Sequence, residues 1–417
     1  MKLQFPVILS SVLIFFSCKN AVTYTEDSSH AVIIHSPQHI KDLQVAKYSE
    51  VFDSVKIIPL QSPANALIGQ IDKILVHNNN IFILDQVQGK AVFEFDINGK
   101  FIRRFGRIGR GPGEYIEPND ISVNDKELSI WVNDQRKFII YDLNGNVLRE
   151  IRTGSVGKCG VPINADRYAL YMDIGGDVKT DEKYDLKVFD HFGKNTNIGF
   201  EKKDKNFSKG SFFFSQNDNG FLVSPGYSNN IYEIRSNSDV LVKKYKIDFG
   251  QYTLPEDFSL KYGTPIRFLR GLDRSGYATL SGYWETPGFL VYSFSYKGLI
   301  YEVYYSKSTG KIKYGNAWFN NVYGIFSGTN KGAYRDYVIS VFDPSNLVSY
   351  QKNYTAPPSK IQTDTIAVAA NKFYGLNTDG EKFVPGDFAY SQEEIDQLQS
   401  IKASDNPVII IKKLKQF

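Results

Sequence analysis

The stretch FDING, at residues 95–99, recurs as YDLNG at 141–145 and as FDHFG at 189–193. In each copy an apolar run ends at an aromatic residue, a polar turn with a glycine follows, and a second apolar run begins. The copies lie roughly 45 residues apart, a period typical of one supersecondary unit repeated in a stack or a ring. The repeat therefore predicts an architecture, whereas a pattern of strands and turns names no chemical function.

Each repeat contains four short apolar runs separated by polar turns. In the first repeat these runs are IDKILV (71–76), IFILD (81–85), AVFEFD (91–96) and KFIRRFG (100–106). Four strands in a meander at this period are typical of one blade of a β-propeller. Weaker repeats follow around Tyr232 and Phe294, and the longer spacing between them predicts an insertion at residues 254–268.

The sixth blade is expected to take strands from both ends of the chain. SVKIIPL (54–60) has no partner near it, and we place it beside PVIIIKKL (407–414) as the outer strand of that blade. Such a closure removes an exposed sheet edge. The predicted fold is therefore all-β: a six-bladed β-propeller whose last blade is closed by the N- and C-terminal strands. A short helical insertion near the C-terminus is expected at 391–402, where Ser391 and Glu394 form a capping box.

The N-terminus has the layout of a secretory signal. A short apolar stretch follows Met1 and Lys2, and Ser17 precedes Cys18. This arrangement resembles a bacterial lipoprotein signal, which implies that Cys18 becomes the lipidated first residue. The predicted division is a signal peptide at 1–17, a lipidated N-terminus with a flexible tether at 18–47, and the propeller at 48–417.

The charge, cysteine content and aromatic content of the chain limit which class of protein it can be. The formal net charge is +4 and the charges are dispersed rather than clustered, so no basic stripe for nucleic acid is evident. Apart from Cys18 the chain contains one cysteine, Cys159, so the mature form has no intramolecular disulfide. Aromatic residues make up 14 % of the chain, which favours strands.

Residues 105–151 resemble an NHL repeat, a blade family with a GPGE-type loop, an inner strand and an aromatic-Asp-x-x-Gly turn. Together with the N-terminal segments SVKIIPL and LIGQIDKI and the ending DNPVIIIKKLK, they make the chain similar to six-bladed propeller lipoproteins of the Bacteroidota. The resemblance spans nearly the whole chain. It implies an outer-membrane lipoprotein in the cell envelope, and for most of that family no reaction is established. Because no acidic run follows Cys18, the periplasmic face is favoured.

Loops that run from an outer strand to the next inner strand emerge on the face where propellers usually bind. Aromatic rings flanked by Arg suit stacking on a sugar or a peptide. For the GPGE loop a tight strand connection is favoured over ligand contact, because Gly and Pro set its backbone angles. The predicted ligand-binding residues are Arg107, Arg110, Glu114, Tyr227, Arg267, Arg270, Tyr283, Trp284 and Trp318.

The predicted propeller, residues 48–417, contains no HxxxH, CxxC, GxSxG or phosphate-loop motif, which favours a role without catalysis. We expect a non-catalytic envelope lipoprotein that binds or scaffolds a glycan, a peptide or an envelope protein. The alternative is a metal-dependent lyase or hydrolase acting at the central channel, because calcium held by carbonyls and carboxylates leaves no local motif. No other cofactor, no metal-ligating residue and no nucleic-acid partner is predicted, and the catalytic residues of the alternative are unknown.

Overall fold

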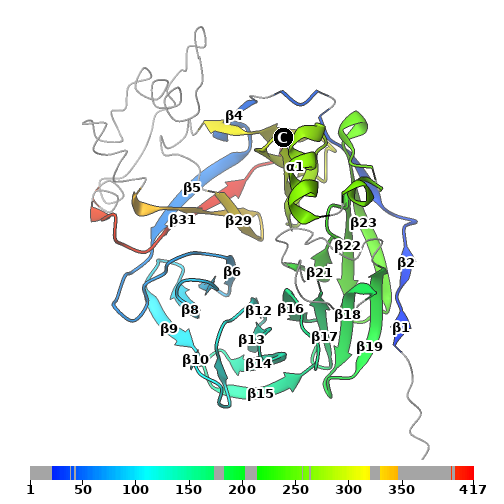
Figure 1. Cartoon of the computed structure of the whole chain (residues 1–417). Helices are drawn as coiled ribbons and strands as arrows, with labels where there is room; N and C mark the ends of the chain where they lie inside the picture. The colour runs from blue at the N-terminus through cyan, green and yellow to red at the C-terminus, as the bar shows by residue number, and fades with distance from the viewer. Residues whose placement is uncertain are drawn as a thin grey trace, which may run out of the picture.

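The computed structural model describes residues 21–417 apart from 38, 42–43, 173–182, 202–213, 256, 263, 320–328, 346–395 and 397–399. Six four-stranded antiparallel sheets stand as blades in a ring (Figure 1). The predicted six-bladed propeller is therefore confirmed. The strands of blades 1 to 3, from the inner to the outer strand, are β6 (Lys73–His77), β7 (Asn80–Asp85), β8 (Ala91–Asp96) and β9 (Phe101–Phe105); β12 (Asp120–Val123), β13 (Glu127–Val132), β14 (Lys137–Asp142) and β15 (Val147–Arg152); and β16 (Cys159–Pro162), β17 (Arg167–Tyr171), β18 (Tyr184–Asp190) and β19 (Asn195–Glu201).

The second half of the ring follows the same order. The strands of blades 4 to 6 are β20 (Ser215–Asn217), β21 (Gly220–Val223), β22 (Asn230–Arg235) and β23 (Val240–Asp248); β24 (Thr279–Glu285), β25 (Phe289–Tyr296), β26 (Leu299–Ser306) and β27 (Ile312–Gly315); and β29 (Thr329–Tyr334), β30 (Tyr337–Phe342), β31 (Val408–Leu414) and β5 (Phe52–Pro59).

The recurring Asp-x-x-Gly phrase forms the turn between the third and fourth strands of blades 1 to 3. In blade 1, Oδ1 of Asp96 accepts hydrogen bonds from the main-chain N–H groups of Asn98 and Lys100, and Gly99 has a φ of 84°. Asp142 and Asp190 accept the equivalent pairs in blades 2 and 3. The aspartate thus satisfies the turn amides, and the glycine supplies the left-handed backbone that other residues rarely adopt.

Blade 6 is closed as predicted by strands from both ends of the chain. β31 pairs antiparallel with β5, in a register that sets Ile409 opposite Ile58. Both of these isoleucines are buried in the core between blades 6 and 1. Asn406, just before β31, strengthens the closure with side-chain hydrogen bonds to the segment that follows β5.

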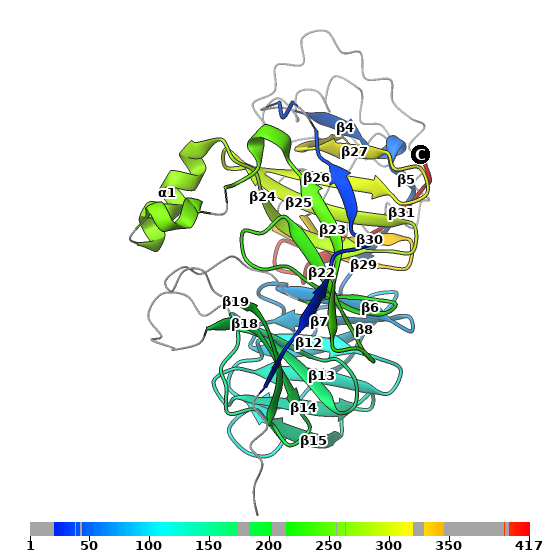
Figure 2. The same cartoon turned by 90° about the vertical axis from the view of Figure 1, so that its right-hand side faces the viewer.

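Residues 22–47, here called the strap, run along the outer side of the ring rather than forming a flexible tether. β1 (Val22–Thr23) pairs with β19, β2 (Thr25–Asp27) and β3 (Val32–His35) pair with β23, and β4 (Val45–Lys47) pairs with β28 (Ala317–Phe319), all in parallel. Figures 1 and 2 show this blue segment passing from blade 3 to blade 5. The tether prediction is therefore wrong for these residues.

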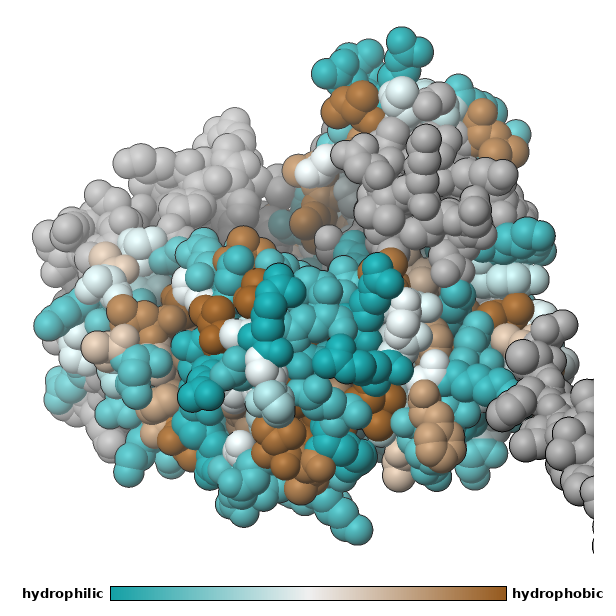
Figure 3. Space-filling view, turned by 60° about the horizontal axis from the view of Figure 1, so that its bottom comes forward, coloured by the Kyte–Doolittle hydropathy of each residue, from teal (hydrophilic) through white to brown (hydrophobic). Residues whose placement is uncertain are grey.

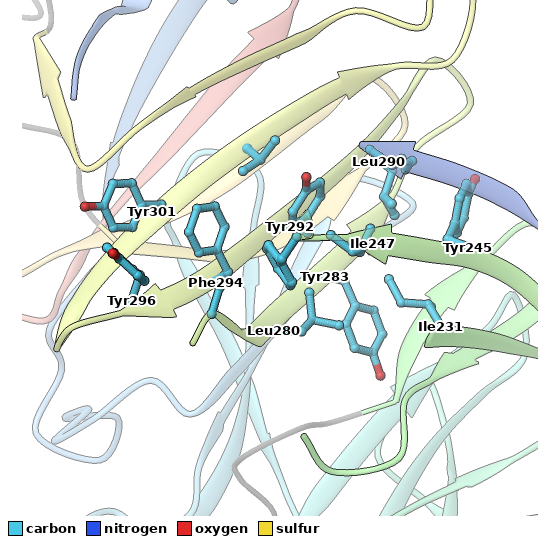
Figure 4. Packing of buried hydrophobic residues seen from close by; sticks show 14 of the residues in the cluster. Ile231, Tyr245, Ile247, Leu280, Tyr283, Leu290, Tyr292, Phe294, Tyr296 and Tyr301 are labelled. Atoms are coloured by element: carbon cyan, nitrogen blue, oxygen red, sulfur yellow. The ribbon is translucent and has the colours of Figure 1, made fainter. Parts of the chain in front are cut away.

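The core lies between the blades. Six buried clusters each join two neighbouring blades around the ring. In the cluster between blades 4 and 5, Tyr283, Tyr292 and Phe294 pack among aliphatic side chains (Figure 4), and the rings of Phe294 and Tyr301 stack at 4.9 Å. Large flat rings fill the wide space between twisted sheets, which explains the aromatic content.

The insertion predicted at residues 254–268 is real and projects from the ring (Figure 2). The whole connection between β23 and β24 contains η2 (Gly250–Tyr252), η3 (Phe258–Lys261) and α1 (Pro265–Ser275). Thr264 caps α1 by accepting a hydrogen bond from the main chain of Arg267, and Gly276 ends the helix in the left-handed region. The second predicted helix, at 391–402, falls mostly outside the described residues. No helix within the described ranges has the length and apolarity needed to span a bilayer.

Candidate functional site

A cavity of about 940 Å³ runs along the axis of the ring. Side chains of β6, β12, β20, β24 and β29 line it, because the inner strand of each blade faces the axis. The inner strands all begin on one side of the ring, which we call the start face; Lys73, the first residue of β6, lies there. They all finish on the opposite side, which we call the end face; Glu285, the last residue of β24, lies there. Other side chains of the cavity wall that carry amide or hydroxyl groups are Gln70, Gln86, Asn124, Ser215, Gln216, Asn217, Ser281, Ser293, Thr329 and Asn330.

At the start face, a buried ion pair joins blades 1 and 2. Nζ of Lys73 lies 2.7 Å from Oδ1 of Asp120 and also donates to the carbonyl oxygen of Phe214. Burial raises the pKa of Asp120, and the neighbouring Lys73 ammonium opposes this effect. Cys159 lies in the adjoining core, where burial raises the pKa of its thiol well above the usual value. A neutral buried thiol is a poor nucleophile, so the cysteine belongs to the core.

At the end face, a network of charged groups ties blade 4 to blade 5. Both Lys244 and Lys307 donate to the Glu285 carboxylate, at 2.8 and 2.6 Å. Asn217 and Tyr245 complete its four hydrogen bonds. Burial alone would raise the pKa of Glu285, but these four donors outweigh it and lower the pKa to about 2. Glu285 is therefore a fixed anion of the channel wall at neutral pH.

A third polar group lies in blade 6, where Asn330 reaches blade 5 by donating to the hydroxyl oxygen of Tyr304 at 2.9 Å. Nζ of Lys412 donates to Oδ1 of Asn330 at 2.8 Å and lies over the rings of Tyr48 and Phe52. Burial lowers the pKa of Lys412 to about 8, an effect that Glu302 in the channel wall opposes. This lysine is fully enclosed, so it positions Asn330 in the wall rather than contacting a ligand itself.

Trp284 supplies the large aromatic surface of the channel. It lies near the end of β24, is only partly buried, and packs on one side against the core between blades 5 and 6. Tyr334 and Arg335 of blade 6 line the same cavity. The wall thus combines an indole ring with amide, hydroxyl and charged groups.

The predicted residues of the GPGE loop hold one another. Nε of Arg107 donates to Oε1 of Glu114 at 2.6 Å, and the main chain of Gly111 donates to Oε2 at 2.8 Å. These hydrogen bonds, first the one from Gly111, lower the pKa of Glu114. Gly113 has a φ of 69° and packs against Val147. The contacts support a tight strand connection, and Arg110 is an exposed residue of the same loop.

Three predicted residues come together at the insertion. The ring of Tyr227 lies 4.8 Å from that of Phe268 on α1, in an edge-to-face contact. Arg267 and Arg270 are exposed on the same helix. None of the three lines the axial cavity, which is bounded by other residues.

The remaining three aromatic residues were expected in loops, and this expectation is wrong. Tyr283 lies within β24 and is buried between blades 4 and 5 (Figure 4). Trp318 lies in β28 and is buried against Tyr304, with ring centroids 5.1 Å apart. Glycines beside both stretches indicated turns, but strand pairing continues past them. Of the nine predicted residues, Tyr283 and Trp284 border the cavity, and of these two only Trp284 is partly exposed.

Sequence reasoning missed the charged channel residues. Lys73 and Asp120 each open an inner strand, and a charge inside an otherwise apolar run was the available signal. In the described part of the chain no three His, Cys, Asp or Glu side chains are grouped closely enough to hold a metal ion. His77 instead pairs with Asp125 at 2.9 Å.

Comparison with known proteins places the chain among propellers without established activity. The family model described as "Domain of unknown function (DUF4934)" matches residues 31–413. A candidate exported protein from Bacteroides fragilis has a similar structure, with a TM-score of 0.70, 18 % identity, and coverage of 92 % of this chain and 100 % of that chain. A member of the DUF4221 family from Bacteroides vulgatus has a TM-score of 0.47 and 10 % identity over 88 % of this chain and 97 % of its own. No curated protein matches the chain.

Proposed function

We propose a ligand-binding function for this chain, which belongs to the DUF4934 family of proteins with a domain of unknown function. In this proposal it is an exported, non-catalytic propeller lipoprotein that binds a short glycan in its axial channel. The observation that supports it is the channel wall itself: a partly exposed Trp284 among amide and hydroxyl side chains, around a volume of about 940 Å³. That volume is typical of ligand sites.

The chemistry of the wall suits a sugar better than an apolar ligand. Amide side chains such as Gln70, Gln86 and Gln216 both donate and accept hydrogen bonds, as sugar hydroxyl groups do. A tryptophan ring offers a flat apolar face to the C–H groups of a pyranose ring. A peptide is the second candidate ligand, because the wall also contains apolar side chains such as Ile74, Val123 and Ile300.

The charged groups of the channel favour binding over catalysis. Asp120 is held by Lys73, and Glu285 is saturated by four donors. Groups that are locked in such pairs fix the shape of the site before a ligand arrives, which lowers the entropic cost of binding.

The proposed location is the periplasmic side of the outer membrane, with lipid attached at Cys18. The support comes from the signal-like leader and from the similar B. fragilis structure, whose protein is described as a candidate exported protein. The GPGE loop and the Asp-x-x-Gly turns of blades 1 and 2 support kinship with NHL repeats.

Tryptophan fluorescence tests the glycan proposal directly. The chain has three tryptophans, and of these Trp131 and Trp318 are buried while Trp284 lines the channel. Titration with a panel of bacterial envelope oligosaccharides should change the emission of the wild type and of Trp318→Phe, but not of Trp284→Phe. A response that persists in Trp284→Phe would place the ligand elsewhere, and no response to any oligosaccharide would refute the proposal.

A further inference from the structure

The outer strands of blades 1 and 2 expose apolar side chains. The described strap strands cover outer edges of blades 3 and 4 and reach blade 5, and none of them pairs with β9 or β15. On these two strands Ile102, Val147 and Leu148 are 38 %, 45 % and 49 % exposed. A contiguous apolar patch on the surface of a folded protein often marks a site of interaction with another protein or a membrane.

Neighbouring turns extend this surface into one continuous strip. The turn of blade 2 approaches β9, where Gly145 faces Arg103. The GPGE loop packs on Val147 through Gly113 and brings the exposed Ile108 alongside. We call this strip, which comprises residues 100–108, 147–152 and the turn at 190–194, the outer rim.

The blade 3 turn adds the most exposed aromatic side chain of the rim. The backbone of Gly193 packs so closely on the carbonyl of Arg152 that any Cβ there would collide with it. The adjacent Phe192 is thereby held beside the end of β15, with 81 % of its surface exposed. Figure 3, which brings the lower side of Figure 1 forward, shows apolar patches among polar side chains on this part of the molecule.

Exposed guanidinium groups accompany the apolar side chains. The side chains of Arg107 and Arg152 are 82 % and 70 % exposed. The nearby Glu114 and Glu150 are both held by main-chain N–H groups, and Lys137 also binds Glu150. Glu114 and Glu150 are therefore largely enclosed, whereas Arg107 and Arg152, which pair with them, extend their guanidinium groups into solvent.

The chain enters the ring at the same place. Val22 pairs with Asn197 near the start of β19, directly after the turn that carries Phe192. The first described strand of the strap, β1, therefore lies close to the outer rim, in the lower half of Figures 1 and 2.

From this juxtaposition we infer that the outer rim rests on a phospholipid surface with anionic headgroups. Apolar side chains flanked by arginines are the combination by which a protein surface lies in the interface of a bilayer. A rim next to the chain entry reaches the membrane at the point where a lipid on Cys18 would hold the protein. Only this last step depends on the proposed lipid anchor, because the exposure and charge of the rim residues do not involve Cys18.

Vesicle sedimentation tests the inference without the lipid anchor. The chain from residue 19 onward keeps every described residue, and it should sediment with vesicles of phosphatidylethanolamine and phosphatidylglycerol but dissociate at high salt. Leu148→Ser combined with Phe192→Ser should weaken the apparent affinity roughly tenfold. The matched control is Ile266→Ser with Leu269→Ser on α1, which removes exposed apolar side chains far from the rim.

The results of this experiment distinguish a membrane from a second copy of the chain as the binding partner of the outer rim. Retained binding in the α1 variant, together with unchanged melting temperatures and an unchanged Trp284 fluorescence response, is the expected result. Equal loss in both double variants, undiminished binding of the rim variant, or no vesicle binding by the unaltered chain would overturn the inference. It would also be overturned if sedimentation velocity showed a dimer that the rim variant dissolves, because the occupant would then be a second copy.

Discussion

Replacement of Asn406 by alanine should destabilise the protein far more than the size of the change suggests. This side chain is buried between the start of β31 and the segment after β5. It donates to the carbonyl oxygens of Gln61 and Ala66 at 2.8 and 2.7 Å, and its oxygen accepts from the main chain of Ile68 at 2.7 Å. The substitution removes three hydrogen bonds and adds none.

The expected magnitude follows from those three bonds. Each contributes about 1 kcal/mol, and buried groups that lose a partner add a desolvation penalty. Ala66 and Ile68 are both buried, so water replaces their lost partner poorly. We expect the free energy of unfolding to fall by about 3 kcal/mol, a large part of the roughly 5–15 kcal/mol that a folded domain has in total.

Urea unfolding followed by circular dichroism provides the measurement. The midpoint should fall while the slope with denaturant stays the same, since the surface exposed on unfolding does not change. Asn144→Ala is the control, because Asn144 is exposed in the turn of blade 2 and its replacement should change stability by less than about 0.5 kcal/mol. If Asn406→Ala cost no more than the control, the closure would not depend on this side chain and the reasoning would be refuted.

Four further predictions address the ring, the channel and the anchor. Folding lowers the pKa of Glu285 to about 2, so the ionised carboxylate stabilises the protein at neutral pH, and this stabilisation is lost as the pH falls from about 4.5 towards 2. Glu285→Gln should therefore flatten this part of the acid unfolding curve, and an unchanged curve would contradict the assignment. Cysteines at Ser54 and Lys413, which face each other across β5 and β31 and are both exposed, should form a disulfide under oxidising conditions, detected by gel mobility; pairs displaced by two residues should not. Deletion of residues 21–47 should lower the melting temperature and promote aggregation measured by light scattering, since it uncovers β19 and β23; a stable monomer would show the strap to be dispensable. Cys18→Ala should shift the protein out of the membrane fraction or leave an unprocessed precursor, and normal fractionation of a fully processed variant would exclude lipidation.

Strands and turns of the ring were predictable because they depend on local chemistry. The Asp-x-x-Gly turn needs one aspartate and one glycine at fixed positions, and the copies at Asp96, Asp142 and Asp190 all form it. Closure of blade 6 was predictable by elimination, since two apolar strands at the chain ends had no local partner.

The strap could not be predicted in the same way. Its strands join the outer edges through main-chain hydrogen bonds, which leave little trace in the side-chain pattern: Val22, Thr25 and Glu26 face solvent. The described strap residues that are buried, Tyr24, Ile34, Ser36, Ile40 and Ala46, are spaced too irregularly to produce an alternation. Pairing between segments distant in sequence is therefore invisible to periodicity.

The channel residues were missed for a different reason. Whether a ring such as Tyr283 or Trp284 faces the core or the axis depends on strand register, and a register change of one residue exchanges the two faces. An irregularity between Leu280 and Gly282 shifts that register within β24, so the two neighbouring rings could be assigned only from the structure.

The strap and β5 also set the order in which the molecule can be assembled. Both are made before every blade they join, so during synthesis their hydrogen-bonding groups remain unpaired until their partner strands have been made. The ring then becomes complete only when β31 is released and meets β5, a pairing between opposite ends of the chain. Contacts of such long sequence separation make folding slow and leave strand edges open in the meantime. A protein of this design needs protection from aggregation until its last residues are available.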